Sequence, residues 1–178
     1  IPGAVESKRA YRNKAIIDTL KESNSALLVD ADFSAPLEYF EKAQEIYIVQ
    51  DMDILKMQET TMFLRELKNI SIDMRKIKII VNKYVKCMLT PKKIVEGLSY
   101  YNDPQMSFID ELLDSKVQYF MVPLNLENYA KYVDCIYKNT IDFKKFSPDF
   151  LEAIQEISNS VYRVDSMTGQ HKKKGIFG

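Results

Sequence analysis

Polar side chains follow several short apolar runs in this chain, where they could take part in chemistry. Asp30 ends one such run and Asp32 follows it closely, whereas Asn82 and Lys83 end another. Two carboxylates at the end of a strand can hold Mg²⁺ when phosphates supply the remaining oxygens. Alternatively, Asp30 simply ends a strand and Asp32 makes a hydrogen bond within its own loop.

Several other catalytic patterns are missing from the sequence. It has no GxxxxGK[ST] loop, whose backbone amides and lysine would grip phosphates. It has no GxSxG elbow to present a nucleophilic serine. His171 is the single histidine and falls near the end of the chain, so we expect no catalytic imidazole and no histidine-ligated metal. The residues alone therefore predict neither a hydrolase nor a nucleoside triphosphatase with a phosphate-binding loop of its own.

The elements that would position these side chains alternate between strands and helices. Four β-rich runs are predicted as strands, at residues 26–30, 46–50, 78–83 and 117–122. Strands that alternate with helices favour parallel pairing with right-handed crossovers, and ligands then bind at the carboxyl ends of the strands. The predicted fold class is α/β, a mostly parallel sheet flanked by helices.

Capping residues and apolar spacing predict the helices. Expected caps precede or begin most of them, at Ser34, Asp53, Thr90, Asn125 and Ser147. Helical spacing is read in residues 5–20, 54–67 and 108–113. The helix that Asn125 would cap carries the apolar residues Ala130, Val133 and Ile136.

Length and composition favour a single globular domain. The 178 residues are 46% hydrophobic and 28% charged, and we divide them into one α/β domain at 1–164 and a basic tail at 165–178. Because 25 basic residues balance 25 acidic ones, no overall field attracts a polyanion, and we expect no nucleic-acid partner. No run approaches the roughly 20 apolar residues that span a bilayer. The chain begins with Ile1, which we interpret as the latter part of a longer protein.

The order of four short motifs resembles that of a known family. The motifs are LLVD at 27–30, IYIV at 46–49, IVNK at 80–83 and MVPL at 121–124. Together they resemble the latter two thirds of the MinD/ParA family of deviant-Walker P-loop ATPases, including its divergent TadZ/CpaE-like members. The resemblance covers about residues 24–162 and implies a P-loop NTPase-like fold that lacks its N-terminal phosphate loop.

The resemblance also implies roles for particular residues. Asp30 matches the Walker B aspartate, which acts near Mg²⁺ and the attacking water, and Asp32 would assist as a metal ligand. Asn82 matches an asparagine that hydrogen-bonds adenine, and a carboxamide suits adenine because it offers both a donor and an acceptor. Pro123 and Leu124 match a segment that lines the base pocket. ATP or ADP with Mg²⁺ would be the cofactors, and hydrolysis would require a KGGxGKT loop upstream of this chain.

The C-terminal tail resembles the membrane-targeting ends of some family members. Its basic and bulky residues are Lys172, Lys173, Lys174, Ile176 and Phe177. Basic residues near an anionic leaflet contribute about 1 kcal/mol each, so weak peripheral membrane contact is one expectation and a disordered tail is the other.

These observations leave three functions open. The first is a positioning or assembly factor that acts through protein partners of a pilus, secretion or partitioning machinery, as a degenerate or truncated ATPase domain and as a homodimer. The second is a true ATPase whose P-loop lies upstream, and the third is a nucleotide-free regulatory α/β domain. The composition, together with Cys87 and Cys135, which lack CxxC spacing, predicts a cytoplasmic location. The resemblance of the tail adds peripheral contact with the inner face of the membrane as an expectation.

Overall fold

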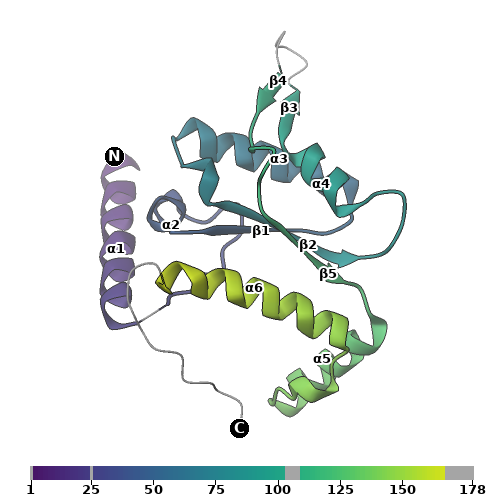
Figure 1. Ribbon diagram of the computed structural model, residues 1–178. Coiled ribbons are helices and arrows are strands. Elements are labelled where there is room, and N and C mark those ends of the chain that lie inside the picture. Colours follow the sequence, from purple (N-terminus) through teal and green to yellow (C-terminus); the bar gives the residue numbers. More distant parts are fainter. Residues whose placement is uncertain (1, 25, 103–108, 167–178) are drawn as a thin grey trace.

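A computed structural model describes residues 2–24, 26–102 and 109–166. It is an α/β fold in which a three-stranded parallel sheet has helices on both faces (Figure 1). The strands of this sheet are β1 (Ile46–Gln50), β2 (Ile77–Tyr84) and β5 (Tyr119–Pro123), in the order β1-β2-β5. The fold class predicted from the sequence is confirmed at this level.

Six α-helices and two short 3-10 helices, η1 (Met74–Lys76) and η2 (Phe143–Lys145), surround the sheet in the described chain. The α-helices are α1 (Pro2–Ser23), α2 (Leu37–Lys42), α3 (Ile54–Asn69), α4 (Pro91–Leu98), α5 (Leu126–Lys138) and α6 (Pro148–Ser166). Helices α3 and α4 cover one face of the sheet and α6 lies across the other (Figure 1). No helix within the described residues is both long and apolar enough to cross a membrane.

The main core lies between the sheet and helices α3 and α4. Alternate residues of β1 and β2 point into it, because successive side chains of a strand point to opposite faces. The fully or almost fully buried side chains there are Ile77, Ile79, Val81, Leu64, Leu67, Ile94 and Leu98. This packing holds the carboxyl ends of β1 and β2 against the start of α3, which is where the candidate site lies.

A polar cluster links the opposite face of the sheet to α6. Lys78 on β2 pairs with Glu45, and its Nζ donates to Ser160 Oγ on α6 at 2.7 Å. The Tyr47 hydroxyl donates to Glu45 Oε2 at 2.6 Å, and burial together with this neighbour raises the pKa of Tyr47 to about 12. The cluster gives α6 a defined position because a mispositioned α6 would leave Lys78 without one of its partners.

Most expected helix caps are confirmed. The side chains of Asp53, Thr90 and Asn125 each accept hydrogen bonds from backbone amides in the first turn of the helix that follows. The cap expected at Ser34 is wrong, because α2 begins at Leu37 after Pro36 and has no side-chain cap. The side chain and backbone amide of Ser34 instead donate to Asp32.

The strand expected at residues 26–30 does not form. This segment is irregular in the structure, and its Leu28 side chain is 81% exposed. A strand needs a neighbour to receive its backbone hydrogen bonds, and the described sheet provides none beside this segment. The apolar sequence alone was therefore insufficient to make a strand.

The helix expected at residues 108–113 is also wrong. Within this region β4 (Ile109–Glu111) forms instead, and it pairs antiparallel with β3 (Tyr100–Asn102). The pair is tied to α3, because Lys68 Nζ lies 2.6 Å from Asp110 Oδ1 and donates to Glu111 O at 2.7 Å. A short apolar run does not distinguish a helix from a strand by periodicity, and here tertiary contacts decide.

Helix α5 forms after Asn125 as expected. Its apolar residues Ala130, Val133 and Ile136 are all exposed. The side that packs on the protein carries Asn128, which exchanges hydrogen bonds with Ser147 at 2.7 and 2.9 Å. The apolar face of α5 is therefore turned to solvent.

Candidate functional site

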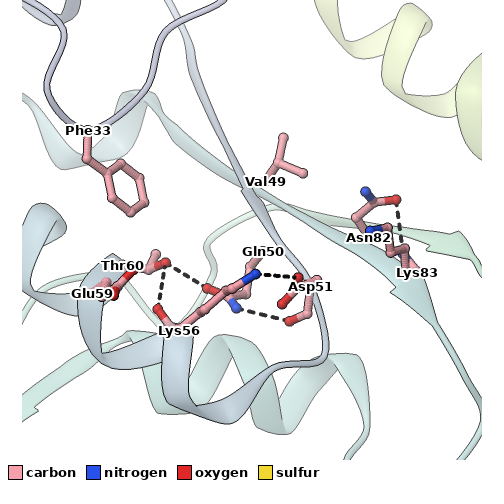
Figure 2. Close-up of a pocket in the computed structure, with 9 residues that line it drawn as sticks. All are labelled: Phe33, Val49, Gln50, Asp51, Lys56, Glu59, Thr60, Asn82 and Lys83. Atoms are coloured by element: carbon pink, nitrogen blue, oxygen red, sulfur yellow. Dashed lines mark hydrogen bonds and ion pairs between the residues drawn. The ribbon is translucent and has the colours of Figure 1, made fainter.

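A cavity of about 210 Å³ opens at the carboxyl ends of β1 and β2 (Figure 2). The two strands, helix α3 and the loop before α2 supply its lining, which consists of Phe33, Val49, Gln50, Asp51, Lys56, Glu59, Thr60, Asn82 and Lys83. This is the edge at which ligands bind in open α/β sheets. Pockets for whole drug-sized ligands begin at roughly 300 Å³, so the cavity suits part of a nucleotide rather than all of it.

Gln50 supports the β1 side of the cavity. Its side chain is only 2% exposed because the strand alternation turns it to the same face as Ile46 and Ile48. Its Oε1 accepts a hydrogen bond from Thr60 Oγ1 at 2.7 Å, and its Nε2 donates to Asp51 O at 3.0 Å. The amide therefore joins the end of β1 to helix α3 and holds the intervening turn.

A β-bulge shapes the β2 side of the cavity. The pairing of β2 with β5 shifts register between Val81 and Tyr84, and Lys83 adopts a left-handed backbone with φ of 54°. A lysine in that region carries about 1–2 kcal/mol of steric strain, and bulges of this kind often re-aim side chains beside functional sites. The bulge turns Asn82 and Lys83 toward the cavity.

Asn82 retains an unused hydrogen-bond donor. Its Oδ1 accepts from the Lys83 backbone amide at 2.9 Å, which fixes the side-chain orientation (Figure 2). Its Nδ2 donates to no residue in the described part of the chain. Because the carbonyl oxygen has a second lone pair, Asn82 can still offer a ligand one acceptor and two donors.

Charged side chains of both signs line the same cavity as Asn82. Lys56 Nζ lies 3.5 Å from Asp51 Oδ2, and Asp51 Oδ1 accepts from the Asp53 backbone amide at 2.9 Å. Among the described residues, Lys83 makes no ion pair with a carboxylate. Its cation is therefore available to an anionic ligand at the mouth of the cavity.

Pro123 and Leu124 lie at the same edge of the sheet as Asn82, one strand away. Pro123 pairs with Tyr84, and the Leu124 amide donates to Tyr84 O at 2.9 Å. Neither residue lines the cavity. The structure thus brings Asn82, Pro123 and Leu124 to one edge without placing all three around one enclosed space.

Asp30 and Asp32 lie outside the cavity on an exposed loop. Asp32 Oδ1 accepts from Ser34 Oγ at 2.7 Å and from the Ser34 amide at 2.8 Å, and these bonds lower the pKa of its carboxyl group. This is the local loop arrangement that the sequence left open as an alternative. The two carboxylates therefore lie away from the residues that line the cavity. Among the described residues, no group of three or more His, Cys, Asp or Glu side chains could hold a metal ion.

Phe33, Gln50 and Thr60 were not anticipated as site residues. Phe33 stacks on Phe63 with ring centroids 4.5 Å apart, which anchors the loop over the cavity. Strand alternation could have identified Gln50, because it shares the phase of buried isoleucines, but no local signal connects Phe33 to α3. The tail residues Lys172, Lys173, Lys174, Ile176 and Phe177 lie outside the described residues.

Comparisons with known proteins assign no relative. The scan against family models found no match, and the searches of curated proteins and of solved structures also found none. The likeness to the MinD/ParA family therefore rests on the order and spacing of short motifs in the sequence.

Proposed function

We propose that this chain is a MinD/ParA-like positioning or assembly factor that binds the adenine part of ATP or ADP at the carboxyl edge of its sheet. It then acts through protein partners of a pilus, secretion or partitioning machinery. The observation that carries the proposal is Asn82, which lines the cavity with an unused amide donor and is fixed by its own bulge. The resemblance supplies the adenine and the class of partner.

The arrangement accounts for binding rather than for catalysis. Asn82 Nδ2 can donate to a ring nitrogen while Oδ1 accepts from an exocyclic amine, as adenine recognition requires. Gln50 and Thr60 keep the floor of the cavity in place, because their mutual hydrogen bond leaves neither group free to rotate. Binding of the adenine part does not require Mg²⁺, and hydrolysis would need the phosphate loop of a longer chain.

Calorimetric titration with ATP, and separately with ADP, tests the proposal. We expect saturable binding to the unaltered protein and at least about a fivefold weaker affinity for Asn82→Ala, since a lost hydrogen bond in a site costs about 1 kcal/mol or more. Asn69→Ala is the matched control, because Asn69 is exposed at the end of α3 and lies outside the cavity. No binding by the unaltered protein, or equal affinities for both variants, would contradict the proposal. The first of these results would favour the nucleotide-free regulatory domain.

A further inference from the structure

The aromatic ring of Phe33 has one covered face and one open face beside the cavity. Its covered face stacks on Phe63, with ring centroids 4.5 Å apart and planes inclined by 18°. Phe33 lines the cavity and is 45% exposed, so its accessible area lies on the second face and on the edges of the ring. An aromatic ring that is supported on one side and open on the other can stack on a second planar ring.

Two sets of contacts hold this ring in place before a ligand binds. Phe63 is 4% exposed, and Phe40 packs edge-on against it with a centroid distance of 5.2 Å. In the loop that carries Phe33, Asp32 Oδ1 accepts from the amide and the hydroxyl group of Ser34 at 2.8 and 2.7 Å. A ring that is already ordered loses little freedom when a ligand stacks on it, so more of the contact contributes to affinity.

Phe33 and Asn82 lie on opposite sides of the cavity, with Val49 and Gln50 between them (Figure 2). The amide of Asn82 can recognise the edge of a base, where the hydrogen-bonding groups of the base lie. An aromatic side chain recognises the face of a base instead. The face and the edge of a planar base point in perpendicular directions, so one base can meet both side chains without competition for the same atoms.

The other lining residues have different chemistry. Among the described residues that line the cavity, Phe33 is the only aromatic one and Val49 is the only other apolar one. The remaining seven are charged or carry hydroxyl or amide groups, and they suit the polar parts of a ligand. Phe33 is therefore the lining residue that can stack on a base.

We infer that Phe33 stacks on the base of the bound nucleotide, so that the cavity recognises a purine by its face as well as by its edge. The inference rests on the proposed function, because it assigns a second contact to the same ligand. Stacking of a base on an aromatic side chain changes affinity by roughly 5- to 150-fold. The two fused rings of a purine offer a larger face than the single ring of a pyrimidine, and the site therefore selects purine nucleotides.

Calorimetric titration with ADP tests the role of the ring. Phe33→Leu removes the ring but keeps an apolar side chain, and it should weaken the binding of ADP at least about fivefold. Phe33→Tyr keeps the ring and should keep the affinity. Phe40→Leu is the matched control, because it removes a ring from the contact with Phe63 but lies outside the cavity lining. Unchanged affinity in Phe33→Leu, or equal weakening in Phe33→Leu and Phe40→Leu, would overturn the inference.

A fluorescent reporter tests stacking directly. The chain contains no tryptophan, so Phe33→Trp introduces a single indole at this position. Its emission should fall in a saturable manner as ADP is added, because a stacked base quenches the indole, whereas ribose 5-phosphate, which has no base, should leave the emission unchanged. Phe143→Trp is the control, since Phe143 is 60% exposed in η2 and lies outside the cavity lining. Emission of Phe33→Trp that ADP does not change, or that both compounds change equally, would overturn the inference.

A comparison of ADP with UDP tests the class of base. The two ligands share the ribose and the phosphates, so a difference in affinity comes from the base. The unaltered protein should bind ADP more tightly than UDP, and Phe33→Leu should reduce the ratio of the two affinities. Equal affinities in the unaltered protein, or a ratio that Phe33→Leu leaves unchanged, would overturn the inference.

The same measurements separate this inference from the proposed function. If Asn82→Ala weakens ADP binding and Phe33→Leu does not, only the stacking assignment fails. If the unaltered protein binds no ADP, both fail. Thermal unfolding shows whether a variant is destabilised, and Phe33→Leu and Phe40→Leu should both lower the melting temperature, because each loses a ring contact with Phe63. A loss of ADP affinity confined to Phe33→Leu is then due to the missing contact with the base.

Discussion

Replacing Thr60 by Val should destabilise the protein because it removes the hydrogen-bond donor to the buried side chain of Gln50. Thr60 is 3% exposed, and its Oγ1 donates at 2.7 Å to Gln50 Oε1, whose residue is 2% exposed. Valine keeps the shape of threonine but removes this donor. Gln50 Oε1 then remains buried without a partner, because the rest of the Gln50 side chain is held by Asp51 O and Asp53 O.

The expected loss follows from the cost of an unsatisfied buried acceptor. That cost is about 1–3 kcal/mol, whereas the substitution creates no cavity. For a chain of this length, 1 kcal/mol lowers the melting temperature by about 2–4 °C, so the total decrease should be about 2–12 °C. The same variant should also weaken nucleotide binding, because Gln50 forms the floor of the cavity.

Thr61→Val provides a matched control one position along the same helix. Thr61 is also buried, but its Oγ1 donates to the backbone oxygen of Met57, at 2.7 Å, four residues earlier in the helix. Its removal leaves that carbonyl oxygen with a helical partner, so the free energy of unfolding should change by less than about 0.5 kcal/mol. Thermal and urea unfolding followed by circular dichroism measure both variants. Equal stabilities for Thr60→Val and Thr61→Val would refute the reasoning.

Two further predictions concern backbone strain and alkaline pH. Lys83→Gly should raise the free energy of unfolding by up to about 1 kcal/mol, because glycine adopts the left-handed backbone without steric strain. The control is Lys86→Gly, at a position without positive φ, which should lower the free energy of unfolding. Urea unfolding measures both variants. The pKa of Tyr47 is raised to about 12 by burial and by Glu45. The raised pKa of Tyr47 contributes to the free energy of unfolding in full below pH 10. This contribution is lost as the pH rises from 10 toward 12, because in that interval the tyrosine ionises in the unfolded chain before it ionises in the folded protein. Unfolding measured across this interval should show a steeper loss for the unaltered protein than for Tyr47→Phe, and parallel losses would contradict the assignment.

The parallel sheet was predictable because its signal is local. The runs that became β1, β2 and β5 are rich in β-branched and aromatic residues, and both faces of the sheet bear helices, which suits continuous apolar strands. Caps at Asp53, Thr90 and Asn125 were predictable for the same reason, because a cap involves only the next three residues. Asn82 was placed correctly at the carboxyl edge by this local reasoning alone.

The remaining features depend on neighbours that a local pattern does not reveal. Residues 26–30 have the composition of a strand, but strand formation requires a partner distant in sequence. The spacing in α5 shows that Val133 and Ile136 share a face, but not whether that face meets the core or solvent. The cavity combines Phe33 with residues of α3 through a stacking contact between Phe33 and Phe63 that no short motif encodes.

The most direct test of the central claim observes the Asn82 side chain while nucleotide is added. In a titration of ¹⁵N-labelled protein with ADP, followed by NMR, the Asn82 side-chain amide should shift in a saturable manner, because Nδ2 gains a ligand partner. The Asn69 side-chain amide should stay unchanged. An Asn82 signal that does not respond at saturating ADP, or a response confined to residues away from the cavity, would contradict the account.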